Sequence, residues 1–152
     1  MFAFVIYDET KQIVYCVRDR AGIKPFFYYW KEGLFLFASE LKAFHQHPSF
    51  EKRINLDSVA SFLQFGNVPT PHCIFQDCYK LSPGHYIEFN VQHSKLDIKK
   101  YWDVYDSYNK PKLKIEFEEA KKETETLLKS AADYRMIADV PGGFEGGYDG
   151  AC

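Results

Sequence analysis

Short apolar runs separated by turn-forming residues are the feature that most constrains the fold of this chain. The run 2–7 (FAFVIY) is apolar at every position, and the run 12–18 (QIVYCVR) follows it after the polar stretch 8–11. Runs of this length, rich in aromatic and β-branched residues, predict strands. Because both faces of 2–7 are apolar, we expect that strand to be covered on each side. The sequence therefore predicts a hairpin over residues 2–18.

Two further hairpins are expected downstream. The runs 26–30 (FFYYW) and 34–39 (LFLFAS) flank a three-residue connection that ends in Gly33. Glycine at the end of a short connection is a strong hairpin signal. Residues 85–91 (HYIEFNV) alternate with a period of two, and 96–102 (LDIKKYW) follow across a polar turn. The sequence thus predicts an antiparallel, β-rich first hundred residues.

Helices are expected at three places. Ser39 is a suitable N-cap for a short helix over 40–44, and Asn55 or Asp57 can cap a longer one that Gly66 closes. Its apolar face carries Val59, Phe62 and Leu63. The third helix, after a polar linker over 105–114, has apolar residues at helical spacing. These residues are Phe117, Ala120, Leu127, Leu128 and Ala131.

Composition narrows the function classes. The formal charge of −2 gives no electrostatic case for binding nucleic acid or an anionic membrane. No apolar run approaches the roughly 20 residues of a membrane span, and no secretory leader pattern is present. Four scattered cysteines do not make a disulfide framework. We expect a soluble, reduced, cytoplasmic protein.

The cysteines and histidines are the first candidates for chemistry. Cys16 falls in a predicted strand and is expected to be an inert core residue. Cys73 and Cys78 lie in the loop-rich stretch 69–80, and His72 adjoins the first of them. A cysteine beside a histidine can form a nucleophile pair, but packing in the core or a loop is the favoured interpretation for each. The spacings do not match common zinc sites.

Asp19 is a second candidate, because it lies between Arg18 and Arg20 in the segment RDRAGIKP. A carboxylate between two guanidinium groups favours a structural ion-pair cluster at the end of a strand. That interpretation is preferred to a role as general acid or base.

The glycine-rich end of the chain is the third candidate. Gly142–Gly143 and Gly146–Gly147 bracket Phe144 and Glu145, and Asp149 follows. Closely spaced glycines let backbone N–H groups approach a phosphate, and a nearby carboxylate can hold Mg²⁺. A flexible tail is the alternative, and the spacing fits neither the Walker A nor the dinucleotide-binding pattern.

Six segments in order resemble the glutamine-hydrolysing asparagine synthetases, from Met1 to about Pro141. They are MFAFVIYD, RDRAGIKPFFYYW, FLFASELKAF, LQFGNVPTPHCIFQDCYKLSPGHYIEF, YWD and RMIADVP. The resemblance implies an α+β fold: the antiparallel, β-rich part of an Ntn-type αββα sandwich, then a helix leading into an incomplete α/β domain of the ATP-pyrophosphatase type. It also implies amidation of aspartate by ammonia from glutamine, with ATP and Mg²⁺.

The resemblance implies a division of the chain into three parts. Residues 1–104 match the second half of a class II (Ntn) glutamine amidotransferase domain, 105–114 form a linker, and 115–152 match the beginning of the synthetase domain. In the family the nucleophile is a cysteine at the mature amino terminus, whereas Met1–Phe2 here matches an internal strand. We therefore expect a fragment or degenerate member with no catalytic residue, inactive alone.

The tail matches the family's pyrophosphate loop, SGGxDS. The residues implied to bind ATP are Phe144, Gly146, Gly147 and Asp149, with Asp149 also binding Mg²⁺. Glu145 and Gly150 stand where the two serines belong. A glutamate carboxylate repels a polyphosphate, which argues against ATP binding by this loop.

Two alternatives remain open on sequence. One is a non-catalytic module that associates with itself or with a complementing partner, because half of a sandwich leaves strand edges and an apolar face uncovered. The other is a related amidotransferase that acts on a carboxylate other than aspartate. By the resemblance the small-molecule partners are glutamine, aspartate and ATP.

Overall fold

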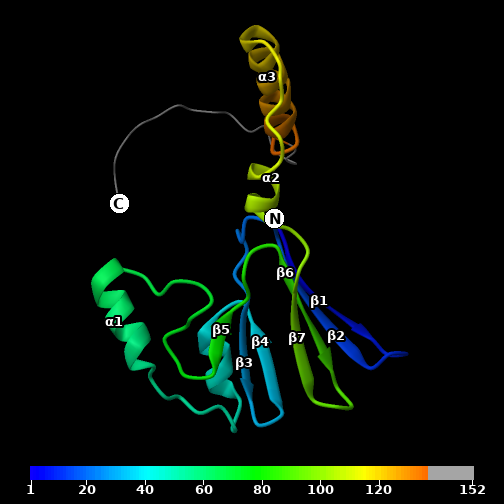
Figure 1. Ribbon diagram of the computed structural model, residues 1–152. Helices are drawn as coiled ribbons and strands as arrows, with labels where there is room; N and C mark the ends of the chain where they lie inside the picture. The colour runs from blue at the N-terminus through cyan, green and yellow to red at the C-terminus, as the bar shows by residue number, and fades with distance from the viewer. Residues whose placement is uncertain (137–152) are drawn as a thin grey trace. The chain divides into compact units, whose positions relative to one another are not determined.

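Two antiparallel sheets make up most of the first of the chain's two units, Met1–Lys110. The computed structural model describes residues 1–136, and the second unit begins at Pro111 (Figure 1). The expected α+β class with antiparallel sheets is therefore confirmed.

The larger sheet has four strands in the order β1-β2-β6-β7. Their bounds are Ala3–Asp8 (β1), Ile13–Arg18 (β2), His85–Asn90 (β6) and Lys95–Lys100 (β7). The two hairpins expected in these regions are present, β1 with β2 and β6 with β7, and β2 pairs antiparallel with β6. The central row of the register runs Val5, Cys16, Ile87 and Ile98.

The smaller sheet has the order β4-β3-β5. Its strands are Phe27–Lys31 (β3), Leu34–Ala38 (β4) and Cys78–Lys80 (β5). The expected hairpin is present, but its connection has two residues and not three, because Lys31 pairs with Leu34. Glu32 and Gly33 both have positive φ, 49° and 84°, as a type I′ turn requires. The strand β5 lies in the stretch expected to be rich in loops, where the sequence predicted no strand.

The first core lies between the two sheets and is largely aromatic. Its buried members are Cys16, Phe26, Tyr28, Leu81, Ile87 and Phe89. Trp30 and Phe35 of the smaller sheet pack against Phe89 of the larger one, with ring centroids 5.5 Å and 4.6 Å away. Aromatic pairs at these separations add to the burial of apolar area. The aromatic excess of the sequence thus holds the two sheets together.

The second core lies on the opposite face of the smaller sheet. Its buried members are Tyr29, Phe44, Cys73 and Cys78, and residues of the irregular segments around positions 50 and 75 pack on them. Successive side chains of a strand point to opposite faces. Tyr28 therefore belongs to the first core, while Tyr29 belongs to the second.

Two of the three expected helices lie in the first unit. The first is a 3₁₀ helix, Leu41–Gln46, preceded by Glu40 without a side-chain cap, so the expected Ser39 cap was wrong. The second, α1 (Leu56–Phe65), is capped by the Asn55 side chain and ends at Gly66 in the left-handed region. Both features of α1 were expected from the sequence.

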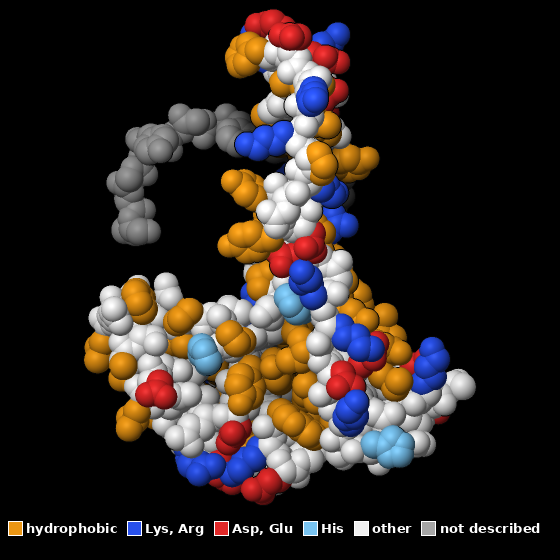
Figure 2. Space-filling view, in the orientation of Figure 1, with side chains coloured by type: hydrophobic (Ala, Val, Ile, Leu, Met, Phe, Trp, Pro, Cys, Tyr) orange, Lys and Arg blue, Asp and Glu red, His pale blue; other side chains and the backbone are white. Residues whose placement is uncertain are grey.

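The apolar stripe of α1 faces solvent in the structure. Phe62 is 51% exposed and Leu63 is 79% exposed, whereas the only buried residue of the helix is Ser58. Hydrophobic side chains gather on this part of the surface in Figure 2. The helix is thus held by its caps and chain connections more than by packing.

The strand β1 was expected to be covered on both faces, and in the structure only one face is covered. Ala3 and Val5 pack against the first core. Phe4 and Ile6 point the other way and are 41% and 55% exposed. The apolar run therefore predicted the strand correctly but not its burial, because only one face of the larger sheet packs on the first core.

The segment that follows β7 contains a short helix that the sequence did not predict. This helix, α2 (Val104–Tyr108), is capped by the Asp103 carboxylate, which accepts from the Tyr105 backbone N–H at 3.0 Å. In the second unit, α3 spans Phe117–Asp133, as the spacing of its apolar residues predicted. Arg135 donates to the Ala131 carbonyl at 2.8 Å near the carboxyl end of α3, where a cation is favoured.

Gly84 sits where the chain enters β6 and leaves no room for a side chain. A Cβ atom there would lie 2.3 Å from the Trp102 carbonyl oxygen, and its φ is +66°. The Gly84 N–H donates to the Asp19 carbonyl, and its own carbonyl accepts from Tyr101 and Trp102. The glycine lets three segments approach one another closely.

We expect Gly84→Ala to lower the free energy of unfolding by roughly 2–4 kcal/mol, through steric overlap and backbone strain together. The matched control is Gly66→Ala, where φ is +72° but nothing lies within 4 Å of the added Cβ. Strain alone makes that loss about 1–2 kcal/mol. Urea denaturation followed by circular dichroism measures both, and equal losses would contradict the close approach at Gly84.

Candidate functional site

The Asp19 carboxylate is buried inside the loop that follows β2, with 3% of the residue exposed. It accepts hydrogen bonds from four backbone N–H groups: Phe2 at 3.3 Å, Ala21 and Ile23 at 3.1 Å, and Lys24 at 3.0 Å. Donors on both sides of a carboxylate stabilise its charged form. The loop therefore wraps around the carboxylate.

Burial raises the pKa of Asp19, but the backbone N–H groups of Lys24, Ile23, Phe2 and Ala21 outweigh it and hold the pKa at about 2. Among residues 1–136 no ion pair joins Asp19 to an arginine. The expected ion-pair cluster was therefore wrong about its partners. A structural role for Asp19 was expected, and it fits a carboxylate whose two oxygens already accept hydrogen bonds from backbone N–H groups of the loop.

Arg18 supplies the complementary half of this junction. Its guanidinium donates to the backbone carbonyls of Lys24 at 2.9 Å, Gly22 at 2.8 Å and Leu81. The Tyr101 hydroxyl donates to the Arg18 carbonyl at 2.7 Å. Side-chain donors thus satisfy carbonyls that the turns leave without partners. The Arg18–Asp19 junction joins the start of β1, the end of β2 and the turn before β6.

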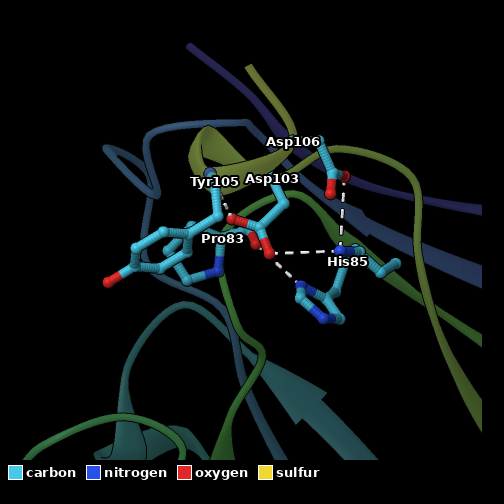
Figure 3. A network of polar contacts seen from close by, with 6 residues as sticks. Pro83, His85, Asp103, Tyr105 and Asp106 are labelled. Carbon is cyan, nitrogen blue, oxygen red and sulfur yellow. Dashed lines mark hydrogen bonds and ion pairs between the residues drawn. The ribbon is translucent and has the colours of Figure 1, made fainter. Parts of the chain in front are cut away.

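A second polar group lies at the carboxyl end of β7, next to Tyr101. The Lys100 ammonium contacts Asp103 at 3.1 Å and Asp106 at 3.3 Å. The Tyr105 N–H and the Lys100 ammonium lower the pKa of Asp103. In Figure 3 the two aspartates, Tyr105 and His85 lie around this contact, and the His85 ring contacts the Pro83 carbonyl at 2.7 Å. Because Asp103 caps α2, we assign these ion pairs a structural role at the start of that helix.

The cysteines predicted to pack in the interior do so. Cys16 is fully buried in the first core, where burial raises its pKa to about 12. Cys73 and Cys78 are each 2% exposed in the second core. Within residues 1–136 no hydrogen bond joins the His72 ring to either thiol. A nucleophile must be charged and accessible to react with a substrate, and none of these three thiols is accessible.

The sequence did not predict that Cys73 and Cys78 lie against each other. Both belong to the second core, and each shifts the pKa of the other, lowering that of Cys73 and raising that of Cys78. The signal available was their separation by a four-residue connection, as in a hairpin. It was weak because 72–80 contains no alternating pattern.

The remaining predicted site residues, Phe144, Gly146, Gly147 and Asp149, lie outside the described residues. Over residues 1–136 the structure contains no cluster of three or more histidine, cysteine or acidic side chains able to hold a metal ion. In the same range no helix is long and apolar enough to cross a membrane.

The fold and the Arg18–Asp19 junction both fall within the part of the chain that matches a known family. Residues 1–102 match the glutamine amidotransferase domain. The chain belongs to this family. The matched region begins at Met1, just before β1, and ends at Trp102, whose N–H donates to the Gly84 carbonyl.

The chain is also similar to longer proteins. Over 98% of the length of the present chain, it is 37% identical to a candidate glutamine-hydrolysing asparagine synthetase of Methanocaldococcus jannaschii. It is 31% identical to asparagine synthetase 3 of Bacillus subtilis over 93% of its length, and 34% identical to the amidase chry2 of Gibberella zeae over 92%. These similarities confirm the resemblance to the glutamine-hydrolysing asparagine synthetases.

The chain spans only part of these relatives. It covers 29% of the Methanocaldococcus protein, 22% of the Bacillus synthetase and 20% of the Gibberella amidase. The aligned region nevertheless reaches beyond residue 102 in each of them, since it takes in more than nine-tenths of this chain.

We expect Asp19→Asn to lower the free energy of unfolding by roughly 2–3 kcal/mol at pH 7, because an amide replaces the charge that the backbone N–H groups face. In the folded protein the pKa of Asp19 is about 2, below its ordinary value of 3.8. The ionised carboxylate therefore contributes its full stabilisation of the fold at pH values above 3.8. That contribution is lost as the pH falls towards 2. The gap between wild type and variant, measured by urea denaturation, should therefore narrow on acidification.

The matched control is Asp97→Asn on β7, where the side chain is 45% exposed and paired with Lys95. An exposed pair contributes less than about 1 kcal/mol. A gap for Asp19→Asn that stayed constant between pH 7 and about 3 would contradict the low pKa assigned to the buried carboxylate.

Proposed function

We propose that this chain contributes to the glutamine-dependent amidation of aspartate, the asparagine synthetase reaction. The observation that carries the proposal is the amidotransferase match over residues 1–102, together with similarity to asparagine synthetases across both units. In that reaction glutamine supplies ammonia, ATP activates the aspartate carboxyl group, and ammonia displaces AMP.

The proposal gives the two units different tasks. Residues 1–104 form the β-rich part of an Ntn-type glutaminase sandwich, residues 105–114 a linker, and residues 115–152 the beginning of a synthetase domain of the ATP-pyrophosphatase type. The two packed sheets of the first unit support the glutaminase assignment. In this role the first unit is a scaffold, because the three described cysteines are buried and cannot attack glutamine.

ATP and Mg²⁺ are proposed for the second unit on the resemblance alone. Gly146 and Gly147 would bring backbone N–H groups to the pyrophosphate, Asp149 would hold Mg²⁺, and Phe144 would lie near adenine. Glu145 opposes this role, since its carboxylate repels the phosphates. The proposal therefore assigns weak nucleotide binding to this segment.

The identity of the acceptor has a second candidate. Besides asparagine synthetases, the chain is 34% identical to an amidase of Gibberella zeae and 31% identical to one of Penicillium rubens. These relatives favour the hypothesis that an amidotransferase of this type can act on a carboxylate other than aspartate. The chemistry of ammonia transfer to an activated carboxyl group is the same in both cases.

A chimera tests the proposed function. Residues 1–102 replace the aligned segment of asparagine synthetase 3 from Bacillus subtilis, and asparagine formation is measured with glutamine and separately with ammonium chloride. Because ammonium bypasses the glutaminase step, it reports whether the rest of the enzyme is intact. We expect the chimera to use both nitrogen sources.

The unmodified chain alone is the companion measurement, and we expect it to release no ammonia from glutamine. A chimera that used ammonium but not glutamine would contradict the glutaminase assignment. Ammonia release by the chain alone would contradict the scaffold role.

A second candidate function, a binding module, is favoured by the unequal edges of the larger sheet. The outer edge strand β7 carries Lys95, Lys99 and Lys100, and charged residues protect an edge from pairing. The other edge strand, β1, has the sequence AFVIYD and exposes Phe4 and Ile6. An apolar edge without a lysine or proline can add a strand from another chain.

Sedimentation velocity at tens of micromolar tests this module. We expect wild type to sediment as a dimer or larger species, and Ile6→Lys to sediment as a monomer because it places a charge on the exposed face of β1. The matched control is Leu63→Lys on α1, which should leave the distribution unchanged. A wild-type monomer with cooperative unfolding would count against association through β1.

A further inference from the structure

Cys73 and Cys78 face each other across two antiparallel segments. His72 pairs with Tyr79 in an antiparallel bridge, and the Lys80 N–H donates to the Pro71 carbonyl at 2.8 Å. The next opposed pair in this register is Cys73 with Cys78. Directly opposed residues in an antiparallel pair have Cα atoms roughly 4.5–5.5 Å apart, which lies within the range that a disulfide spans.

The two cysteines also share a buried environment, since both are members of the second core. The neighbouring Cys78 thiol and the backbone N–H groups of Phe75 and Ile74 lower the pKa of Cys73, in spite of its burial. The neighbouring Cys73 and burial raise the pKa of Cys78. Cys73 is therefore the thiol of the pair that ionises more readily, and the thiolate is the reactive form.

The pair lies beneath a part of the fold that can open locally. Cys78 is the first residue of β5, a three-residue strand that pairs with β3 on one side and with only an isolated bridge on the other. The segment before it contains only isolated bridges, at His72 and at Phe75. Short edge strands with few backbone hydrogen bonds open more often than central strands do. A small oxidant can reach the two sulfurs during such openings, although each residue is 2% exposed in the closed state.

We propose that Cys73 and Cys78 form a redox-active dithiol that hydrogen peroxide closes to an intramolecular disulfide. The Cys73 thiolate attacks one peroxide oxygen, so that an S–O bond forms, the O–O bond breaks and hydroxide leaves as water after taking a proton. Cys78 then attacks the Cys73 sulfur, and an S–S bond forms as the S–O bond breaks and a second water leaves. Two thiols and one peroxide give one disulfide and two waters.

Cys16 provides an internal comparison. It is fully buried in the first core on the central strand β2, and burial alone raises its pKa to about 12. No other cysteine belongs to that core among residues 1–136. Cys16 is therefore expected to stay reduced under conditions that oxidise the Cys73–Cys78 dithiol.

Peptide mapping of the folded chain tests the proposal. A Cys152→Ser background leaves Cys16, Cys73 and Cys78, and the protein is treated with hydrogen peroxide, quenched with catalase, alkylated in denaturant and digested without reduction. We expect a peptide linked through Cys73 and Cys78, a mass lower by about 2 Da for the two hydrogens lost, and full alkylation of Cys16. Dithiothreitol should restore both thiols.

Two variants sharpen the assignment. Cys16→Ser should leave formation of the disulfide unchanged, and Cys78→Ser should stop the reaction at a sulfenic acid on Cys73, which dimedone traps. The mapping of the background protein needs neither variant, so a folding defect in one of them does not affect the test. Complete alkylation of Cys73 and Cys78 at peroxide levels that oxidise free cysteine would overturn the proposal, as would a disulfide that includes Cys16.

Discussion

The rest of the first unit depends on one buried charge, the Asp19 carboxylate. The residue before β1 and the loop after β2 carry partly buried backbone N–H groups, and each one left without a partner costs free energy. Asp19 accepts from four of these groups, while the Arg18 guanidinium satisfies carbonyls of the same region. These hydrogen bonds join the start of β1, the end of β2 and the turn before β6.

The hairpins could be predicted from the sequence because their signals are local. Apolar runs on either side of a short polar stretch that ends in glycine indicate two strands and the turn between them, as at Gly33, although the length of that turn was predicted one residue too long. The strand β5 could not be predicted in this way, because its three residues become a strand only by pairing with β3. The exposure of Phe4 and Ile6 was missed for a related reason, since burial depends on the neighbours of a strand and not on its own residues.

The chemistry of the site was less predictable than the fold. The arginines beside Asp19 are conspicuous in the sequence, whereas its actual partners are backbone groups, which every residue carries. The contact between Cys73 and Cys78 follows from a register across an irregular segment, and no sequence pattern encodes that register. The membership of the amidotransferase family rests instead on the order and spacing of whole segments.

The two-residue turn at Glu32 and Gly33 sets the pairing register of β3 with β4, and through it the packing of both cores of the first unit. Because β3 supplies alternate side chains to two different cores, its pairing with β4 decides which aromatic ring enters which interior. A slip of one residue would exchange the two sets, placing Tyr29 against the larger sheet and Tyr28 beneath the irregular segments. One short turn thereby determines the contents of two interiors that share no buried residue.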